Sequence, residues 1–225
     1  LELRDSFGDV SRADRPALAG LRARADRSAH EFITARLAQE RPQDAVLSEE
    51  GEDDPIRATA ERVWIVDPLD GTWEYGQGRP DFAVHIALWS RAAAGDQLSA
   101  CTVDLPAQGV TFSQLDEVPT YPDVPRDRAV RLVVSRSRRP AGLDDVVAHM
   151  STRLAERGVT GRGVEVVEVG GVGAKAAELL SGRAEIYWHD SGFHDWDLAA
   201  PLGVARHRGL WCAAPDGSPF QLNRY

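Results

Sequence analysis

The spacing of apolar residues along the chain predicts one long helix near the start, followed by a group of strands. Between Arg22 and Gln39, apolar side chains recur on one side at helical spacing. The apolar or alternating runs that follow are typical of strands: AVLS, RVWIVD, FAVHIALWS and the hairpin LSACTVDLPAQGVTFS. The run RVWIVD is continuous and rich in β-branched residues, as expected of a strand with both faces buried. These elements predict an antiparallel or mixed sheet with a flanking helix.

The second half of the chain has a different pattern. A Pro- and Asp-rich passage, residues 115–128, precedes it and is the best candidate for a linker. Strands then alternate with helices: AVRLVVS, LDDVVAHMSTRLAERG, VEVVEVG, GAKAAELLSGRA, EIYWH and WDLAAPLGVARHRG. Such alternation indicates an α/β arrangement. We therefore predict an N-terminal α+β part over residues 1–118 and a C-terminal α/β part over residues 126–225, together forming one compact catalytic unit.

Composition narrows the class of protein. The chain is 43% hydrophobic and 27% charged, which is ordinary for a globular domain, and no apolar run approaches the roughly 20 residues that span a bilayer. A formal net charge of −9 argues against a nucleic-acid partner, because phosphate backbones are bound by clustered Lys and Arg. Cys101 and Cys212 are far apart and lack metal-ligand spacing, so free thiols are expected. We predict a cytoplasmic location.

Acidic residues recur where a predicted strand ends or a helix begins. Glu49 follows AVLS, Asp67 follows WIV, Asp70 precedes a Gly-Thr pair, and Asp197 begins the helix DLAAPLGVA. Carboxylates at such positions can converge in loops without disrupting a core. They repel one another unless a cation lies between them. Oxygen ligands of this kind suit Mg²⁺ or Mn²⁺ better than zinc.

The turn between Asp67 and Asp70 has two interpretations on its residues alone. In the first, Pro68 stiffens the turn, Gly71 admits an anion close to the backbone, and a helix beginning near Thr72 points N–H groups at the same place. In the second, Asp-x-x-Asp-Gly is only a turn and helix cap. The two carry about equal weight. The D-x-D-G-T nucleophile motif of haloacid-dehalogenase-type phosphatases is not matched, because here two residues separate the aspartates.

Several motifs together resemble one known family. LSEEG, WIVDPLDGTWEY and WDLAAP are similar, in order and spacing, to the signature motifs of the magnesium-dependent, lithium-sensitive phosphatases of the inositol monophosphatase superfamily. LAQERPQDAVLSEEG and DFAVHIALW are most similar to actinobacterial CysQ-type proteins, which dephosphorylate 3′-phosphoadenosine 5′-phosphate. The resemblance covers nearly all of the chain. It implies a layered αβαβα sandwich of the inositol monophosphatase and fructose-1,6-bisphosphatase type, and relative to that family an N-terminal helix and a closing C-terminal segment are expected to be missing.

The resemblance also implies a role for each matching residue. The ligands of two or three Mg²⁺ ions would be Glu49, Asp67, the carbonyl of Leu69, Asp70 and Asp197. Mn²⁺ would be a substitute and Li⁺ an inhibitor. Asp26, Thr72 and Glu49 would be catalytic, with Asp26 and Thr72 orienting and deprotonating the attacking water. The backbone amides of Gly71 and Thr72 would bind the phosphate. The alternative for Asp26 is a solvated charge on a helix face.

Substrate recognition follows the family less closely. Related bisphosphate phosphatases have a Gly-Ser-Ser-x-Lys turn and a later arginine, where this chain has GGVGAK and a histidine. The predicted substrate-binding residues beyond Gly71 and Thr72 are Gly171, Gly173, Lys175, His189 and Asp190, the last at the position where inositol phosphatases bind sugar hydroxyls. The alternative for Lys175 is an exposed helix lysine. A third metal either binds weakly or is helped by Asp14 and Arg15, because the family's usual loop before Asp26 is altered.

These observations lead to one prediction with two alternatives. We predict an Mg²⁺-dependent phosphatase that converts 3′-phosphoadenosine 5′-phosphate to AMP and phosphate. The alternatives are an inositol monophosphatase or fructose-1,6-bisphosphatase of broad specificity and, from another class, a metal- and nucleotide-binding module without turnover. The expected partner is a small phosphate ester, without nucleic acid or membrane, and monomer and homodimer are both open. His85, within FAVHIALW, is expected to be a strand histidine with a backbone partner.

Overall fold

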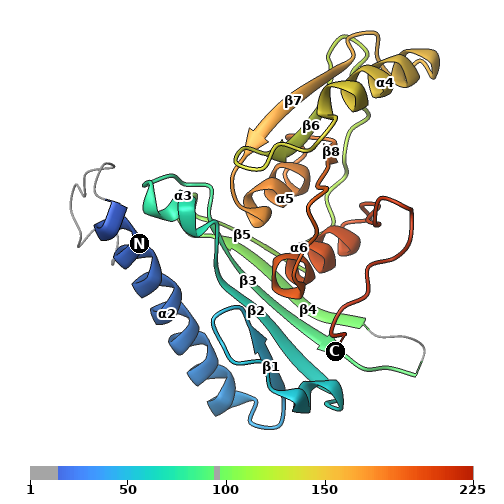
Figure 1. The fold of residues 1–225 in the computed structure, drawn as a ribbon. Coiled ribbons are helices and arrows are strands. Elements are labelled where there is room, and N and C mark those ends of the chain that lie inside the picture. Colours follow the sequence, from blue (N-terminus) through green and yellow to red (C-terminus); the bar gives the residue numbers. More distant parts are fainter. Residues whose placement is uncertain (1–14, 94–96, 225) are drawn as a thin grey trace.

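Helices and sheets alternate in layers in the computed structural model, which describes residues 15–93 and 97–224 (Figure 1). The layers follow the order α2 (Arg15–Glu40), a five-stranded sheet, the pair α5 (Val172–Leu180) and α6 (Asp195–His207), a three-stranded sheet, and α4 (Leu143–Glu156). This is the predicted αβαβα sandwich, which is confirmed. Helix α2 contains the predicted helix and extends beyond it at both ends.

The larger sheet is mixed, as predicted. Its strands lie in the order β1 (Ala45–Ser48), β2 (Arg62–Asp70), β3 (Ala83–Ser90), β4 (Gln97–Leu105) and β5 (Val110–Ser113). Strand β1 runs parallel to β2, and the remaining neighbours are antiparallel. A 3-10 turn, η1 (Pro55–Ala58), separates β1 from β2, and the short helix α3 (Thr72–Gly76) follows β2. The ends of β1 and β2 therefore deliver their acidic residues to the same edge.

The smaller sheet is parallel and has the order β7 (Val164–Val169), β6 (Val130–Ser135) and β8 (Ile186–Tyr187). The strand predicted for EIYWH is only two residues long. The chain turns at His189, whose Nε2 lies 2.8 Å from the Gly192 carbonyl oxygen. This turn directs the chain back to the larger sheet, where α6 contacts β2, β3 and β4.

The main core lies between the larger sheet and the α5–α6 layer. Side chains on β3 alternate, and those facing this core are at most 3% exposed: Ala83, His85, Ala87 and Trp89. Small residues on α6 allow the helix to approach the sheet closely. Ala199 and Ala200 are buried against it. Helix α2 forms a layer of its own and contacts the larger sheet at β2.

Two features of the described residues complete the fold. None of the helices within 15–93 and 97–224 is long and apolar enough to cross a membrane. Cys101 and Cys212 are both free thiols, as predicted, and Cys101 is buried beneath α6. The division at residues 118–126 stays a prediction, and residues 1–14 and 94–96 of its first part lie outside the described residues.

Close packing of α6 on β4 gives a test of this core. A Cβ at Gly203 would meet Cys101 Sγ and lie 2.9 Å from Cys101 Cβ, so Gly203→Ala is expected to lower the free energy of unfolding by about 1–3 kcal/mol. Combining it with Cys101→Ala is expected to cost less than the sum of the single changes, because the sulfur is gone. Urea denaturation measures the free energy of unfolding of the single and the double variants. Gly20→Ala, where a Cβ meets nothing within 4 Å, is the control, and strict additivity of the pair would contradict this packing.

Candidate metal centre and active site

A β-bulge brings Asp67 and Asp70 to one face of the larger sheet. In a regular strand, residues three apart point to opposite faces, because side chains alternate with a period of two. Here Asp67 pairs with His85 and Asp70 with Ala83, so β2 advances three residues while β3 advances two. Pro68 has no amide hydrogen to contribute to the ladder and fits such an irregular position. Both carboxylates consequently face α5 and α6.

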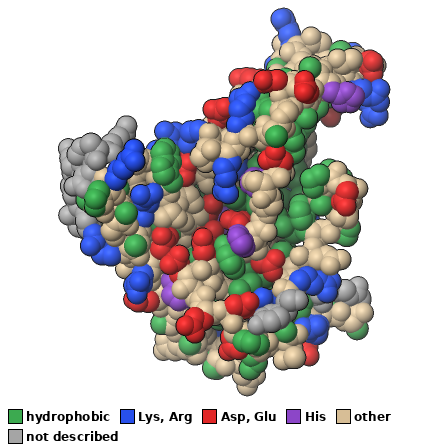
Figure 2. Space-filling model, viewed as in Figure 1, with side chains coloured by type: hydrophobic (Ala, Val, Ile, Leu, Met, Phe, Trp, Pro, Cys, Tyr) green, Lys and Arg blue, Asp and Glu red, His purple; other side chains and the backbone are tan. Residues whose placement is uncertain are grey.

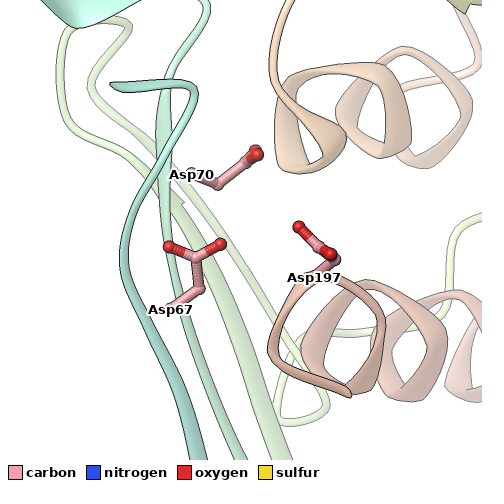
Figure 3. A group of neighbouring side chains, drawn as sticks. All are labelled: Asp67, Asp70 and Asp197. Carbon is pink, nitrogen blue, oxygen red and sulfur yellow. The ribbon is translucent and has the colours of Figure 1, made fainter. Parts of the chain in front are cut away.

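Asp197 completes the acidic group from the first turn of α6. Asp67, Asp70 and Asp197 each offer an oxygen within 4.8 Å of the others, and Figure 3 shows the side chains of β2 and α6 directed toward the same space. Asp67 is 1% and Asp70 7% exposed. In the space-filling view, acidic side chains gather at the centre of the visible face, between the part with α2 and the part with α4 (Figure 2). The three predicted aspartate ligands, which come from the two separate segments β2 and α6, do converge.

Each of these carboxylates has one oxygen held by a backbone amide. Asp67 Oδ1 accepts from Leu69 N at 3.0 Å, Asp70 Oδ2 from Gly173 N at 2.7 Å, and Asp197 Oδ2 from His194 N at 2.8 Å. These bonds fix the orientation of each carboxylate and leave its second oxygen for another partner. The site is therefore preorganised by main-chain groups from three elements.

Glu49 joins the group at the end of β1, where it keeps contact with solvent. Burial raises the pKa of Glu49, a hydrogen bond with Asp67 opposes the rise, and repulsion from Asp197 adds to it. The pKa of Asp67 lies well above its ordinary value, first because of burial and then because of Asp70 and Glu49. Without a cation, burial and mutual repulsion therefore favour the protonated form of these carboxyl groups.

The donor set fits divalent cations. The ligating atoms are carboxylate oxygens, which Mg²⁺ and Mn²⁺ prefer. The pKa of Asp67 is raised by burial first and then by the negative charge of Asp70 and Glu49 beside it. A cation between the carboxylates would relieve the repulsion directly. Which ion binds, and how many, stay predictions.

Asp26 and Thr72, the predicted water-activating pair, lie on α2 and α3, two helices that contact each other. Asp26 is on α2, 9% exposed, and its pKa is raised to about 7, by burial first and then by Glu50 and Glu49. It is therefore no solvated surface charge. Thr72 begins α3, and its hydroxyl donates to the carbonyl of Leu69 at 3.1 Å. Gly71 has a φ of 81°, which favours glycine in this turn. Their catalytic roles stay predictions.

The GGVGAK turn packs directly against the acidic group. A Cβ at Gly171 would lie 2.5 Å from Asp70 Oδ2, so glycine is required there for close approach. Lys175 is 2% exposed, and its ammonium donates to the carbonyls of Gly170 and Gly171, the latter at 2.9 Å. The alternative of an exposed helix lysine is wrong. Desolvation lowers the pKa of Lys175, against the attraction of Asp70.

The other predicted substrate-binding residues, His189 and Asp190, lie on the segment between β8 and α6. His189 stacks on Phe193, with ring centroids 4.1 Å apart, and burial lowers the pKa of its imidazole. Asp190 is exposed and accepts from the amide of Ala141 at 2.9 Å. Arg15, expected to assist a third ion, is exposed at the start of α2, and Asp14 lies outside the described residues. The substrate roles of these residues stay predictions.

One functional element was not anticipated from the sequence. Asp81, between α3 and β3, forms an ion pair with Arg136, whose Nη1 lies 2.6 Å from Oδ2, and accepts from Gly170 N at 3.0 Å. Its backbone carbonyl accepts from Gly171 N at 3.1 Å. Asp81 thus fastens the glycine turn beside Asp70. An acidic residue directly before the apolar strand FAVHIALW was the only available signal.

Comparisons with known proteins agree with this geometry. A model of the inositol monophosphatase family matches residues 16–224. Proteins called 3′-phosphoadenosine 5′-phosphate phosphatase are similar: that of Mycobacterium tuberculosis (strain CDC 1551 / Oshkosh) is 40% identical, over 88% of this chain and 71% of its own. The Mycobacterium leprae (strain TN) protein is 38% identical, over 100% and 79%. The solved structure of inositol monophosphatase II from Staphylococcus aureus MSSA476 has a TM-score of 0.69 at 18% identity, over 93% and 79%, which shows the fold.

Protonation of Asp26 gives a pH-dependent prediction for the metal-free protein. Its pKa rises from an ordinary 3.8 to about 7 on folding, so the folded state binds the proton more tightly and loses stability as pH rises from about 4 to 7. Asp26→Asn is expected to be more stable than the parent by about 1–3 kcal/mol at pH 8, and equal to it near pH 4. Urea denaturation with EDTA at both pH values measures this. Exposed Asp145→Asn is the control, and an equal difference at both pH values would contradict the assignment.

Proposed function

The chain belongs to the inositol monophosphatase family of metal-dependent phosphomonoester hydrolases, and we propose that it converts 3′-phosphoadenosine 5′-phosphate to AMP and phosphate. The observation that carries a phosphatase function is the acidic group of Asp67, Asp70 and Asp197, within 4.8 Å of one another. The substrate is proposed from the names and similarity of the mycobacterial relatives. A cytoplasmic location and the oligomeric state stay predictions.

The proposed mechanism uses water as the nucleophile. Glu49, Asp67, Asp70 and Asp197, with the carbonyl of Leu69, would hold Mg²⁺ or Mn²⁺. Bound ions of this kind supply charge neutralisation for the phosphoryl oxygens and a more acidic water. Such assistance matters because the hydrolysis of phosphate monoesters is among the slowest uncatalysed reactions. Li⁺ is the expected inhibitor.

Residues around the ligands would orient the water and the ester. The hydroxyl of Thr72 donates to the carbonyl of Leu69, so its oxygen lone pairs would be available to accept from the attacking water. Asp26, with a pKa of about 7, is suited to accept a proton near neutral pH. The amides of Gly71 and Thr72 would bind the phosphate at the close approach that glycine allows. No covalent intermediate with the protein is required.

Phosphate release from a substrate panel tests the proposed function. We expect 3′-phosphoadenosine 5′-phosphate to have the highest kcat/KM with Mg²⁺, ahead of 3′-AMP, inositol 1-phosphate and fructose 1,6-bisphosphate, and Li⁺ to inhibit. Asp70→Asn removes a ligand charge without changing shape and should lower kcat at least about 100-fold, whereas exposed Asp123→Asn should not. A preference for inositol 1-phosphate or fructose 1,6-bisphosphate would instead assign the chain to that substrate class. Binding without turnover would establish a binding module.

Lys175 provides a separate test of recognition of the second phosphate. If its ammonium exchanges the carbonyls of Gly170 and Gly171 for the 5′-phosphate, Lys175→Met raises KM for 3′-phosphoadenosine 5′-phosphate and leaves that for 3′-AMP unchanged. We expect this selective effect because burying a charged ammonium costs free energy, and binding of the 5′-phosphate would offset that cost. Steady-state kinetics on both substrates measure it. An equal loss on both would show that Lys175 only supports the turn.

A further inference from the structure

The imidazole of His85 lies at the back of the acidic group and is in reach of each segment that supplies a predicted aspartate ligand. Its Nδ1 is 3.9 Å from Asp67 Oδ2, and its Nε2 is 3.6 Å from Asp70 Oδ2. Nδ1 also lies 3.3 Å from the carbonyl oxygen of Trp196, the residue directly before Asp197. The side chain is 0% exposed. One ring therefore borders both β2 carboxylates and the first turn of α6.

The hydrogen-bonding chemistry fixes how this ring is oriented. A carbonyl oxygen can only accept, so Nδ1 must carry the hydrogen and donate to Trp196. This bond orients the ring and ties β3 to the residue before Asp197. The expected backbone partner of His85 is confirmed. That expectation did not anticipate that the ring faces two carboxylates.

Nε2 has no hydrogen-bond partner among the described residues, although it is fully buried. An unpartnered polar atom in the interior costs free energy that an apolar side chain would avoid. The neighbouring positions on this face of β3 are Ala83 and Ala87. A histidine among such residues is therefore poorly explained by packing alone. Its nearest acidic oxygen belongs to Asp70.

Helix α5 has a glycine, Gly173, at the position that faces the imidazole ring. A Cβ at Gly173 would meet His85 Nε2 and lie 2.6 Å from Ala83 Cβ. The amide of Gly173 donates to Asp70 Oδ2, the same oxygen that lies nearest to His85 Nε2. Glycine at this position thus serves two partners, because it leaves room for the imidazole and brings its amide to the carboxylate.

We propose that His85 is a positioning residue: its bond to the Trp196 carbonyl fixes the start of α6, and its ring packs against Asp67 and Asp70, so that the three carboxylates keep the arrangement that binds divalent cations. It lies behind the carboxylates, and its side chain is 0% exposed. This inference rests on the proposed function only in that the acidic group binds cations. It does not depend on which phosphate ester is hydrolysed.

Mn²⁺ binding by His85 variants tests the proposal without measuring activity. His85→Leu keeps a comparable volume and removes all hydrogen bonding, and His85→Asn keeps a donor and an acceptor near Cβ. Free Mn²⁺ is followed by electron paramagnetic resonance during titration of each protein. We expect the Mn²⁺ dissociation constant to rise about 10- to 100-fold in His85→Leu, and less in His85→Asn. His149→Leu, on exposed α4, is the matched control and should bind as the parent does.

Unfolding in EDTA separates positioning from general support of the fold. His85→Leu loses the bond to the Trp196 carbonyl and also removes the unpartnered Nε2, so the two effects oppose each other. Without metal its urea midpoint should therefore stay close to that of the parent, yet it should bind Mn²⁺ more weakly. Parental Mn²⁺ affinity in His85→Leu would overturn the proposal. If that variant does not fold, His85→Asn decides in the same way. A parent protein that binds Mn²⁺ but hydrolyses no ester of the panel would overturn the proposed function and leave this inference intact.

Discussion

The arrangement of the rest of this structure depends on how the repulsion between its buried carboxylates is compensated. Asp67 and Asp70 are almost inaccessible to water on strand β2, and Asp197 faces them from helix α6. Charges in such surroundings remain ionised only when hydrogen bonds or cations compensate them. The backbone amides of Leu69, Gly173 and His194 provide one bond to each aspartate. A bound divalent ion would provide the remaining compensation, so folding and cation binding are expected to support each other.

The site is built where the two sheets meet through the α5–α6 layer. Asp70 belongs to the larger sheet but is held by an amide at the start of α5, and Asp81 reaches the preceding turn. The glycines of this turn allow the approach, because a side chain at Gly170 would meet Glu74. Packing between the sheets therefore sets the geometry of the ligands directly. A change far from the acidic group can alter it by moving this turn.

Local signals predicted the individual strands and helices and the candidate acidic ligands, whereas the order of the layers followed from the resemblance to the family. Continuous apolar runs indicated β2 and β3, and Asp67, Asp70 and Asp197 followed from their positions at element ends. The bulge that places Asp67 and Asp70 on one face has no such signal, since it depends on pairing with β3. The burial of Lys175 could not be predicted from the sequence either, because its partners are backbone carbonyls. His85 was recognised as a strand residue, but its neighbours come from β2 and α6, which only the tertiary structure brings together.

The bulge in β2 has a consequence for how this protein family can diverge. Because the two aspartates share a face only through one extra residue, the segment between them tolerates exchange of side chains more readily than any change of length. Loss of a single codon there would leave both aspartates on one face of a regular strand, but it would remove the turn in which Leu69 N donates to Asp67 Oδ1 and the Leu69 carbonyl accepts from Thr72. Natural variation is therefore expected to preserve the spacing between these aspartates even where Leu69 itself is replaced.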